Sequence, residues 1–181
     1  MSTNPLQVFT RNQHAGALKP IAHGATDNFA LVRDNAGSPY FRVLVADDNE
    51  ADRLRTIEML GQAWPAGRNI LVECAADGAE ALEKIHRNRY ALVVLDWNMP
   101  LPDGAGVLPT IRSKGLRVPV VVVSDKRREA IAADLETMAA AYVHKHQLDP
   151  CLLSNAIAGA ILLLDGVFGL VRAGYETNLH G

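Results

Sequence analysis

The sequence predicts an α/β fold, a doubly wound sheet of five parallel strands with helices on both faces. From residue 41 onward, short apolar runs alternate with longer segments of helical periodicity. The run VPVVVV at 118–123 contains no polar side chain, which is typical of a strand covered on both faces. The 181 residues suit one such domain with tails, and 49% hydrophobic residues suffice for its core.

Each expected element has its own signal. The strands are the apolar runs at 41–46, 70–75, 91–96, 118–123 and 142–145. Helices are expected between them at 51–62, 79–87, 107–113 and 128–140. The apolar face of the first helix is expected to consist of Leu54, Ile57, Met59 and Leu60.

The last helix has a defined start and a predicted end. Asp149 is expected to cap it, and Pro150 suits its first position. Asp165-Gly166 is a stop signal, so the helix should end near Leu164. The apolar stretch at 156–171 is shorter than the ~20 residues of a membrane span, and we expect a buried or dimer-forming helix.

These patterns set the domain limits. Residues 1–38 show no sustained periodicity, and we expect a flexible N-terminal tail, although a short element near residues 29–32 stays open. The domain is expected at 39–165, and a C-terminal tail at 166–181.

Composition excludes several classes of function. A net charge of −2 provides no field that would attract nucleic acid or an acidic membrane surface, so we expect neither partner. No secretory signal is visible. Cys74 and Cys151 indicate no disulfide framework, and we expect both to be reduced in a cytoplasmic protein.

The residues that could take part in binding or catalysis lie at the ends of the predicted strands. Asp47 and Asp48 follow the first strand, Asp96 ends the third, Ser124 follows the fourth and Lys145 ends the fifth. In an open parallel sheet the carboxyl ends of the strands meet at one crevice, so these side chains should converge. Close carboxylates repel one another unless a cation lies among them, and the arrangement therefore predicts a metal ion.

Further residues accompany this set in a fixed order. They are Asp77-Gly-Ala-Glu-Ala-Leu82, Met99-Pro100, Asp103-Gly104 and Tyr142. Together with the strand-end residues, they make the chain resemble, over roughly residues 41–164, the receiver domain of two-component response regulators of the chemotaxis type. The resemblance implies a flavodoxin-like receiver fold with strand order 2-1-3-4-5.

The resemblance also implies a function. Asp96 would accept a phosphoryl group from a sensor histidine kinase or a phosphotransfer protein, as in a phosphorelay. The chain would be no enzyme beyond its self-catalysed phosphotransfer and dephosphorylation. It would signal by phosphorylation-dependent binding to a downstream protein target, and a homodimer is a further possibility.

The resemblance assigns a Mg²⁺ site to the acidic residues. Asp48, Asp96 and the backbone carbonyl of Asn98 would bind the ion directly, and Asp47 would act mainly through water. Mg²⁺ prefers oxygen ligands and keeps some of its waters, which suits a site with two or three protein groups.

The remaining site residues would respond to the phosphoryl group. Lys145 would supply a point cation to its oxygens, and Ser124 would donate a hydrogen bond. Tyr142 occupies the position of an aromatic residue that turns inward on activation, so Ser124 and Tyr142 form the expected switch.

Three positions depart from the family pattern. His146 follows Lys145 where proline is usual, so we expect a trans bond and a slightly altered loop. Asp125 replaces a small residue beside the site and would repel a phosphoryl group. Alanines at 139–141 replace a glycine between alanines, which favours a longer fourth helix.

Three functions remain open at this point. The favoured one is a stand-alone receiver, whose output passes through a partner or a second copy. A degenerate receiver that binds partners without phosphorylation is the alternative that Asp125 favours. A Mg²⁺-dependent phosphohydrolase of the haloacid dehalogenase type would need an acid two places after the nucleophile, where this chain has Asn98.

Overall fold

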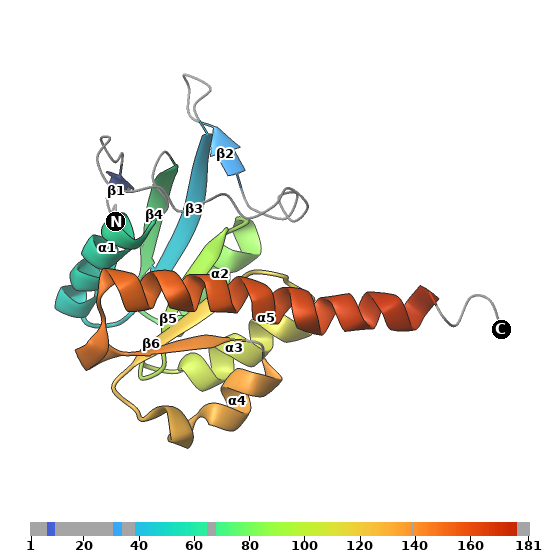
Figure 1. Ribbon diagram of the computed structural model, residues 1–181. Helices are drawn as coiled ribbons and strands as arrows, with labels where there is room; N and C mark the ends of the chain where they lie inside the picture. Colours follow the sequence, from blue (N-terminus) through green and yellow to red (C-terminus); the bar gives the residue numbers. More distant parts are fainter. Residues whose placement is uncertain (1–6, 10–30, 34–38, 65–67, 139, 177–181) are drawn as a thin grey trace.

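The computed structural model describes residues 7–9, 31–33, 39–64, 68–138 and 140–176. One sheet lies between two layers of helices (Figure 1). The strands are β1 (Gln7–Phe9), β2 (Leu31–Arg33), β3 (Pro39–Ala46), β4 (Asn69–Ala75), β5 (Leu92–Asp96), β6 (Val120–Ser124) and β7 (Ala141–His144). The α-helices are α1 (Glu50–Ala63), α2 (Gly78–Arg87), α3 (Gly104–Ser113), α4 (Ala132–Thr137) and α5 (Pro150–Glu176). Short 3₁₀ helices span Arg128–Ala130 and Lys145–Gln147.

Five parallel strands form the centre of the sheet, in the order β4-β3-β5-β6-β7. Counted along the chain, this is the predicted order 2-1-3-4-5, and the fold prediction is confirmed. The strand order reverses between β3 and β5, which lie side by side. Sheets of this kind bind ligands at the carboxyl ends of the strands where the order reverses.

Two short strands extend this sheet, and one of them, β2, overlaps the short element near residues 29–32 that the sequence pattern left open. β1 pairs antiparallel with β4 at the edge of the sheet, and β2 pairs antiparallel with residues 39–41 of β3. β5 pairs only with residues 43–46, so the start of β3 keeps one edge open for β2. The prediction of a flexible tail over residues 1–38 therefore does not hold for β1 and β2, whose pairing covers exposed strand edges.

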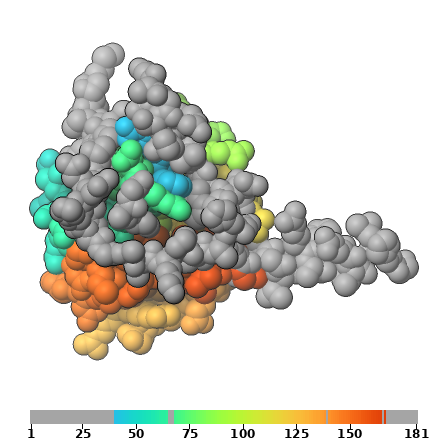
Figure 2. Space-filling model, turned by 45° about the horizontal axis from the view of Figure 1, so that its top comes forward, coloured from blue at the N-terminus to red at the C-terminus, as the bar shows by residue number. Residues whose placement is uncertain are grey.

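Alternate residues of each central strand face opposite helix layers, as the strand period of two requires. In β3, Val45 packs in the cluster that includes Leu60 of α1, on the face that α1 and α5 cover. Leu44 packs in the cluster that includes Leu108 of α3, on the face of α2, α3 and α4. Figure 2 shows α5 in orange beside α1 in teal along one side of the molecule.

One residue of the predicted apolar face of α1 was placed wrongly. Thr56, Ile57 and Leu60 are the buried residues of α1, whereas Leu54 is half exposed. At about 100° per residue, Leu54 lies more than a quarter turn from the centre of this buried stripe.

The fourth helix is shorter than predicted. The segment 128–140 forms a 3₁₀ turn and then the six-residue α4, which ends at Thr137. Arg112 donates from Nε to the Met138 carbonyl at 2.7 Å, and the Ala140 N–H bonds to the Leu135 carbonyl. These bonds end the helix despite the helix-forming alanines, because the chain must turn here to enter β7.

The fifth helix begins as predicted and continues further. The Asp149 carboxylate accepts the Leu152 N–H at 2.8 Å, which confirms the cap. α5 does not end at Leu164 but continues to Glu176, so most of the predicted C-terminal tail is helical. Among the described glycines only Gly115 adopts positive φ, and Gly166 therefore does not form the helix-ending turn. Within the part of the chain that the structure describes, no helix is long and apolar enough to cross a membrane.

Candidate functional site

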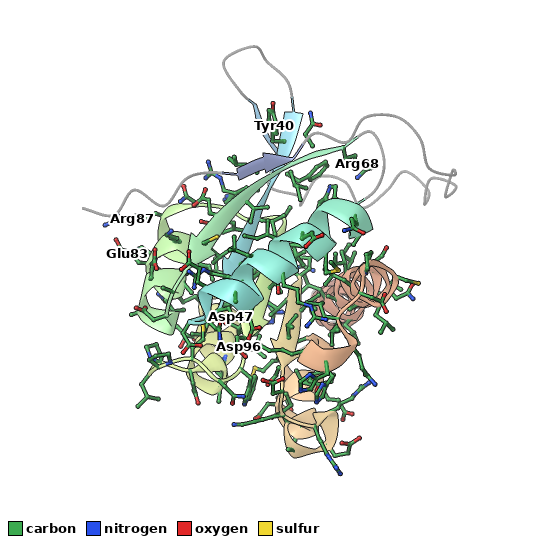
Figure 3. All side chains as sticks on the ribbon, turned by 90° about the vertical axis from the view of Figure 1, so that its left-hand side faces the viewer. Tyr40, Asp47, Arg68, Glu83, Arg87 and Asp96 are labelled. Carbon is green, nitrogen blue, oxygen red and sulfur yellow. The ribbon has the colours of Figure 1, made fainter. Side chains whose placement is uncertain are left out.

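The strand ends bring the predicted polar side chains to one edge of the sheet. Asp47 follows β3, Asp96 and Ser124 are the last residues of β5 and β6, and Lys145 follows β7. The side chains of Asp47, Asp96 and Ser124 are buried. Figure 3 shows Asp47 and Asp96 next to each other below α1. The sheet therefore assembles residues that are up to about a hundred positions apart in the sequence.

The Lys145 ammonium lies at the centre of this group. Its Nζ is 2.9 Å from Oδ2 of Asp47, 2.9 Å from Oδ2 of Asp52 and 3.0 Å from Oδ2 of Asp96. An ammonium has three N–H donors, so each carboxylate takes one of them. The side chain of Lys145 is only 12% exposed, and the attraction is therefore weakly screened by water.

The second oxygens of the two buried carboxylates are also bound. Oδ1 of Asp47 accepts the Asn49 N–H at 2.9 Å, and Oδ1 of Asp96 accepts the Asn98 N–H at 3.2 Å. Arg53 donates from its guanidinium to the backbone carbonyl of Asp47 at 2.6 Å. Both carboxylates are thus fixed in orientation by groups from their own loops.

Burial and charge act in opposite directions on the pKa values in this site. Burial raises the pKa of Asp47 above its usual value, although Lys145 and the Asn49 N–H partly offset the rise. Burial alone would lower the pKa of Lys145, but its hydrogen bonds to Asp47, Asp52 and Asp96 raise it overall. Lys145 therefore stays a cation at neutral pH.

The acidic residues meet the chemical requirements of a Mg²⁺ site. Asp47, Asp48 and Asp96 each offer one carboxylate oxygen, and these oxygens lie within 4.8 Å of one another. Three carboxylates already share one ammonium, so the site keeps an excess of negative charge that a divalent cation would neutralise. Oxygen donors are the ligands that Mg²⁺ prefers.

Ser124 and Tyr142 both contact the loop that follows β6. The Ser124 side chain is buried, and its Oγ accepts the Lys126 N–H at 3.1 Å. The Tyr142 hydroxyl donates to the Lys126 carbonyl. The backbone of Lys126 is therefore bonded to both Ser124 and Tyr142.

The loop after Asp96 packs closely against the first residues of α2 and α3, and no added side-chain atom would fit there. A Cβ on Gly78, at the start of α2, would lie 1.7 Å from the Pro102 carbonyl oxygen. A Cβ on Gly104, at the start of α3, would lie 2.7 Å from Cα of Trp97. Asp103 caps α3 by accepting the Gly106 N–H. Glycine at both helix starts thus allows the loop to approach closely and keeps Asp96 in place.

Sequence reasoning found most of this group and missed part of it. The predicted residues Asp47, Asp48, Asp96 and Lys145 lie together, whereas the role of the Asn98 carbonyl stays a prediction. Asp52 was missed. Only three residues separate β3 from α1, so the first turn of α1 begins at the edge of the site. An acidic side chain in that turn was the available signal.

The sequence comparisons identify similar proteins. The sequence model of the response regulator receiver domain matches residues 43–158. The transcriptional regulatory protein PrrA of Mycobacterium tuberculosis is 36% identical over 124 residues, which cover 68% of this chain and 49% of PrrA. The transcriptional regulatory protein TctD of Salmonella typhimurium is 35% identical over 91 residues, or 50% of this chain and 38% of TctD. The chain thus spans about half the length, or less, of these curated relatives.

Solved structures show the same fold. The receiver domain of the Francisella response regulator 1452 is similar with a TM-score of 0.54 and 28% identity, over 70% of this chain and 98% of that one. A CheY-like receiver domain protein from Methanospirillum hungatei gives a TM-score of 0.58 at 22% identity, over 70% of this chain and 98% of that one. The second likeness supports the fold alone.

Proposed function

Because the chain belongs to the response regulator receiver domain family, we propose that Asp96 accepts a phosphoryl group from a histidine kinase or a phosphotransfer protein. The observation that carries the proposal is the buried Asp96 carboxylate at the end of β5, whose Oδ2 lies 3.0 Å from the Lys145 ammonium. Asp47 is also buried and bound to Lys145, so burial and this ion pair do not by themselves choose between the two carboxylates. Asp96 is favoured because it ends the central strand β5 and is followed by Met99-Pro100, as the acceptor is in the family pattern.

The transfer is a displacement at phosphorus. A carboxylate oxygen of Asp96 attacks the phosphorus atom, and the bond from phosphorus to the donor histidine nitrogen breaks. That nitrogen keeps the electron pair, and the product is an acyl phosphate on Asp96. Attack of water on the same phosphorus later releases phosphate and restores the carboxylate, so no separate substrate is turned over.

The residues around Asp96 support the transfer electrostatically. Lys145 neutralises the phosphoryl oxygens, and Ser124, whose Oγ accepts from Lys126, retains its own O–H as a donor to them. Asp47, Asp48, Asp96 and the Asn98 carbonyl would hold Mg²⁺. When bound, this ion supplies positive charge to the phosphoryl oxygens during transfer.

The loop after β6 would convert phosphorylation into a change of surface. A hydrogen bond from Ser124 to the phosphoryl group draws the loop toward Asp96, and Lys126 moves with it. Because Tyr142 donates to the Lys126 carbonyl, its ring follows. A downstream protein, or a second copy of the chain, would recognise this altered surface.

Intact mass spectrometry after incubation with acetyl phosphate and Mg²⁺ tests the proposal. We expect one added phosphoryl group on the wild-type protein, and none in Asp96→Asn or in the presence of EDTA. A matched histidine kinase replaces acetyl phosphate in a second arm, because some receivers accept phosphate only from a kinase. If no mass is added in either arm, a receiver that binds partners without phosphorylation becomes the better interpretation.

Asp125 is the residue that favours this second function, and its effect can be measured. Its side chain is 56% exposed beside Ser124, and its Oδ1 is 3.8 Å from Nε2 of His146. In Asp125→Ala we expect phosphorylation by acetyl phosphate to be roughly two to three times faster, because a partly screened like charge is removed. Glu136→Ala is the control, because it removes an equal charge at an exposed position of α4. Unchanged rates of phosphorylation and hydrolysis in Asp125→Ala would show that this carboxylate does not oppose transfer.

A further inference from the structure

The contact between Asp52 and Lys145 has no part in the chemistry above. Asp52 lies in the first turn of α1, and its Oδ2 is 2.9 Å from the Lys145 Nζ. We propose that Asp52 is a positioning residue that holds Lys145 before phosphorylation and loses it to the phosphoryl group afterwards. In consequence, Asp52 lowers the stability of the phosphorylated form. The inference rests on the proposed function and extends it to a residue outside the acceptor and metal set.

The donors of the ammonium are all in use before phosphorylation. Its three N–H groups point to Asp47, Asp52 and Asp96. Phosphorylation replaces the Asp96 carboxylate, so the N–H that bound it passes to the phosphoryl group, and a second phosphoryl oxygen can gain an N–H only from Asp47 or Asp52. The side chain of Asp47 is 5% exposed, and breaking its contact would leave a buried charge uncompensated.

Asp52 is the partner that can leave at low cost. Its side chain is 37% exposed, so water can solvate the carboxylate once the ammonium moves away. It also lies on a helix, whereas the other two carboxylates are fixed at strand ends by backbone N–H groups. The exchange therefore takes place at Asp52.

The charge change gives the exchange a direction. The Asp96 carboxylate carries one negative charge, whereas an acyl phosphate there carries about two, spread over its oxygens. Asp52 thus exchanges an attraction to Lys145 for a repulsion by the phosphoryl group. Removing the charge of Asp52 is expected to favour the phosphorylated form.

Beryllium fluoride provides a reversible test, because it binds a phospho-accepting carboxylate as a mimic of the phosphoryl group. The affinity is measured in the presence of Mg²⁺ through the fluorescence of Trp97, the buried residue next to Asp96. We expect Asp52→Asn to bind roughly five times more tightly than the wild-type protein, as for loss of one partly screened charge.

Two further variants separate charge from structure. Glu50→Gln removes an equal charge from the same turn of α1, where no contact with Lys145 is found, and is expected to change the affinity little. Asp52→Glu retains the charge and is expected to bind like the wild-type protein. Raising the salt concentration should reduce the difference in beryllium fluoride affinity between Asp52→Asn and the wild-type protein. A purely structural effect of the substitution would not depend on salt in this way.

The outcomes distinguish this inference from the proposed function. If the wild-type protein binds beryllium fluoride and Asp52→Asn binds equally or more weakly, the role of Asp52 is refuted while the proposed function stands. The same holds if Glu50→Gln matches Asp52→Asn. If the wild-type protein binds none and acquires no phosphoryl group from acetyl phosphate or a kinase, both proposals fall.

Discussion

Replacing Lys145 with methionine is expected to lower the free energy of unfolding by about 3 kcal/mol at neutral pH without divalent cations. The substitution keeps most of the side-chain length and removes the charge. Asp47 and Asp96 then remain buried within reach of each other, with no ammonium between them. An uncompensated buried charge costs far more than the loss of an exposed ion pair.

The loss should depend on pH with a defined sign. Burial already holds the folded-state pKa of Asp47 above its usual value, and the ammonium is one of the groups that lower it. Without Lys145 this pKa rises further. A raised folded-state pKa favours folding below the unfolded-state pKa of the group, and this contribution is lost as pH rises through the folded-state value. Lys145→Met should therefore approach the wild-type stability in acid and lose most at neutral pH.

Urea unfolding at several pH values, with and without Mg²⁺, measures this effect. Arg87→Met is the matched control, since the partner of Arg87 is Glu83, an exposed carboxylate on the surface of α2. We expect it to cost less than about 1 kcal/mol. Asp96→Asn in the Lys145→Met background should restore stability. An equal loss at every pH would mean that packing, and not charge, accounts for the change.

Gly78→Ala is expected to destabilise the protein by about 3 kcal/mol, through a single added methyl group. Its Cβ would lie 1.7 Å from the Pro102 oxygen and 2.8 Å from Cγ2 of Val107. A backbone oxygen cannot turn away as a side chain can, so α2 or the loop after Asp96 must move. Because this loop fixes Asp96, we also expect slower phosphorylation by acetyl phosphate.

Gly159→Ala is the control, because it makes the same chemical change in α5, where a Cβ would meet no atom within 4 Å apart from its chain neighbours and the backbone of its own helix. Alanine forms helices better than glycine, so this variant should gain up to about 1 kcal/mol. Thermal unfolding of both variants measures the two changes in stability, a loss in Gly78→Ala and a gain in Gly159→Ala. Similar stability of Gly78→Ala and wild type would show that the loop is not fixed by this contact.

The sequence predicted what depends on short-range pattern. The apolar runs located the five parallel strands, and the polar residue after each run located Asp47, Asp96, Ser124 and Lys145. What it missed depends on contacts between distant segments. α4 ends early because Arg112 of α3 holds the Met138 carbonyl, and no local signal reports that bond.

The pairing of β1 with β4, the pairing of β2 with β3 and the contact of Asp52 with Lys145 also depend on distant segments of the chain. β2 uses an edge that exists only because β5 begins later than its neighbour β3. Asp52 reaches Lys145 across 93 positions of the chain. Composition and periodicity describe neighbours in sequence, so neither can reveal such a meeting of strand ends and helix starts.

The arrangement around Lys145 also has a consequence for biosynthesis. The Lys145 ammonium bonds to Asp96 and Asp52, which precede it by 49 and 93 positions. Among the described strands β7 comes last along the chain, so it leaves the ribosome after β3 and β5. Until it arrives, a nascent chain holds its acidic residues together with no lysine to balance them, and their repulsion opposes closure. Sheets built from such distant contacts form late in folding. The proposed acceptance of a phosphoryl group on Asp96 therefore requires the completed central sheet, and a nascent chain without β7 would lack Lys145 for it.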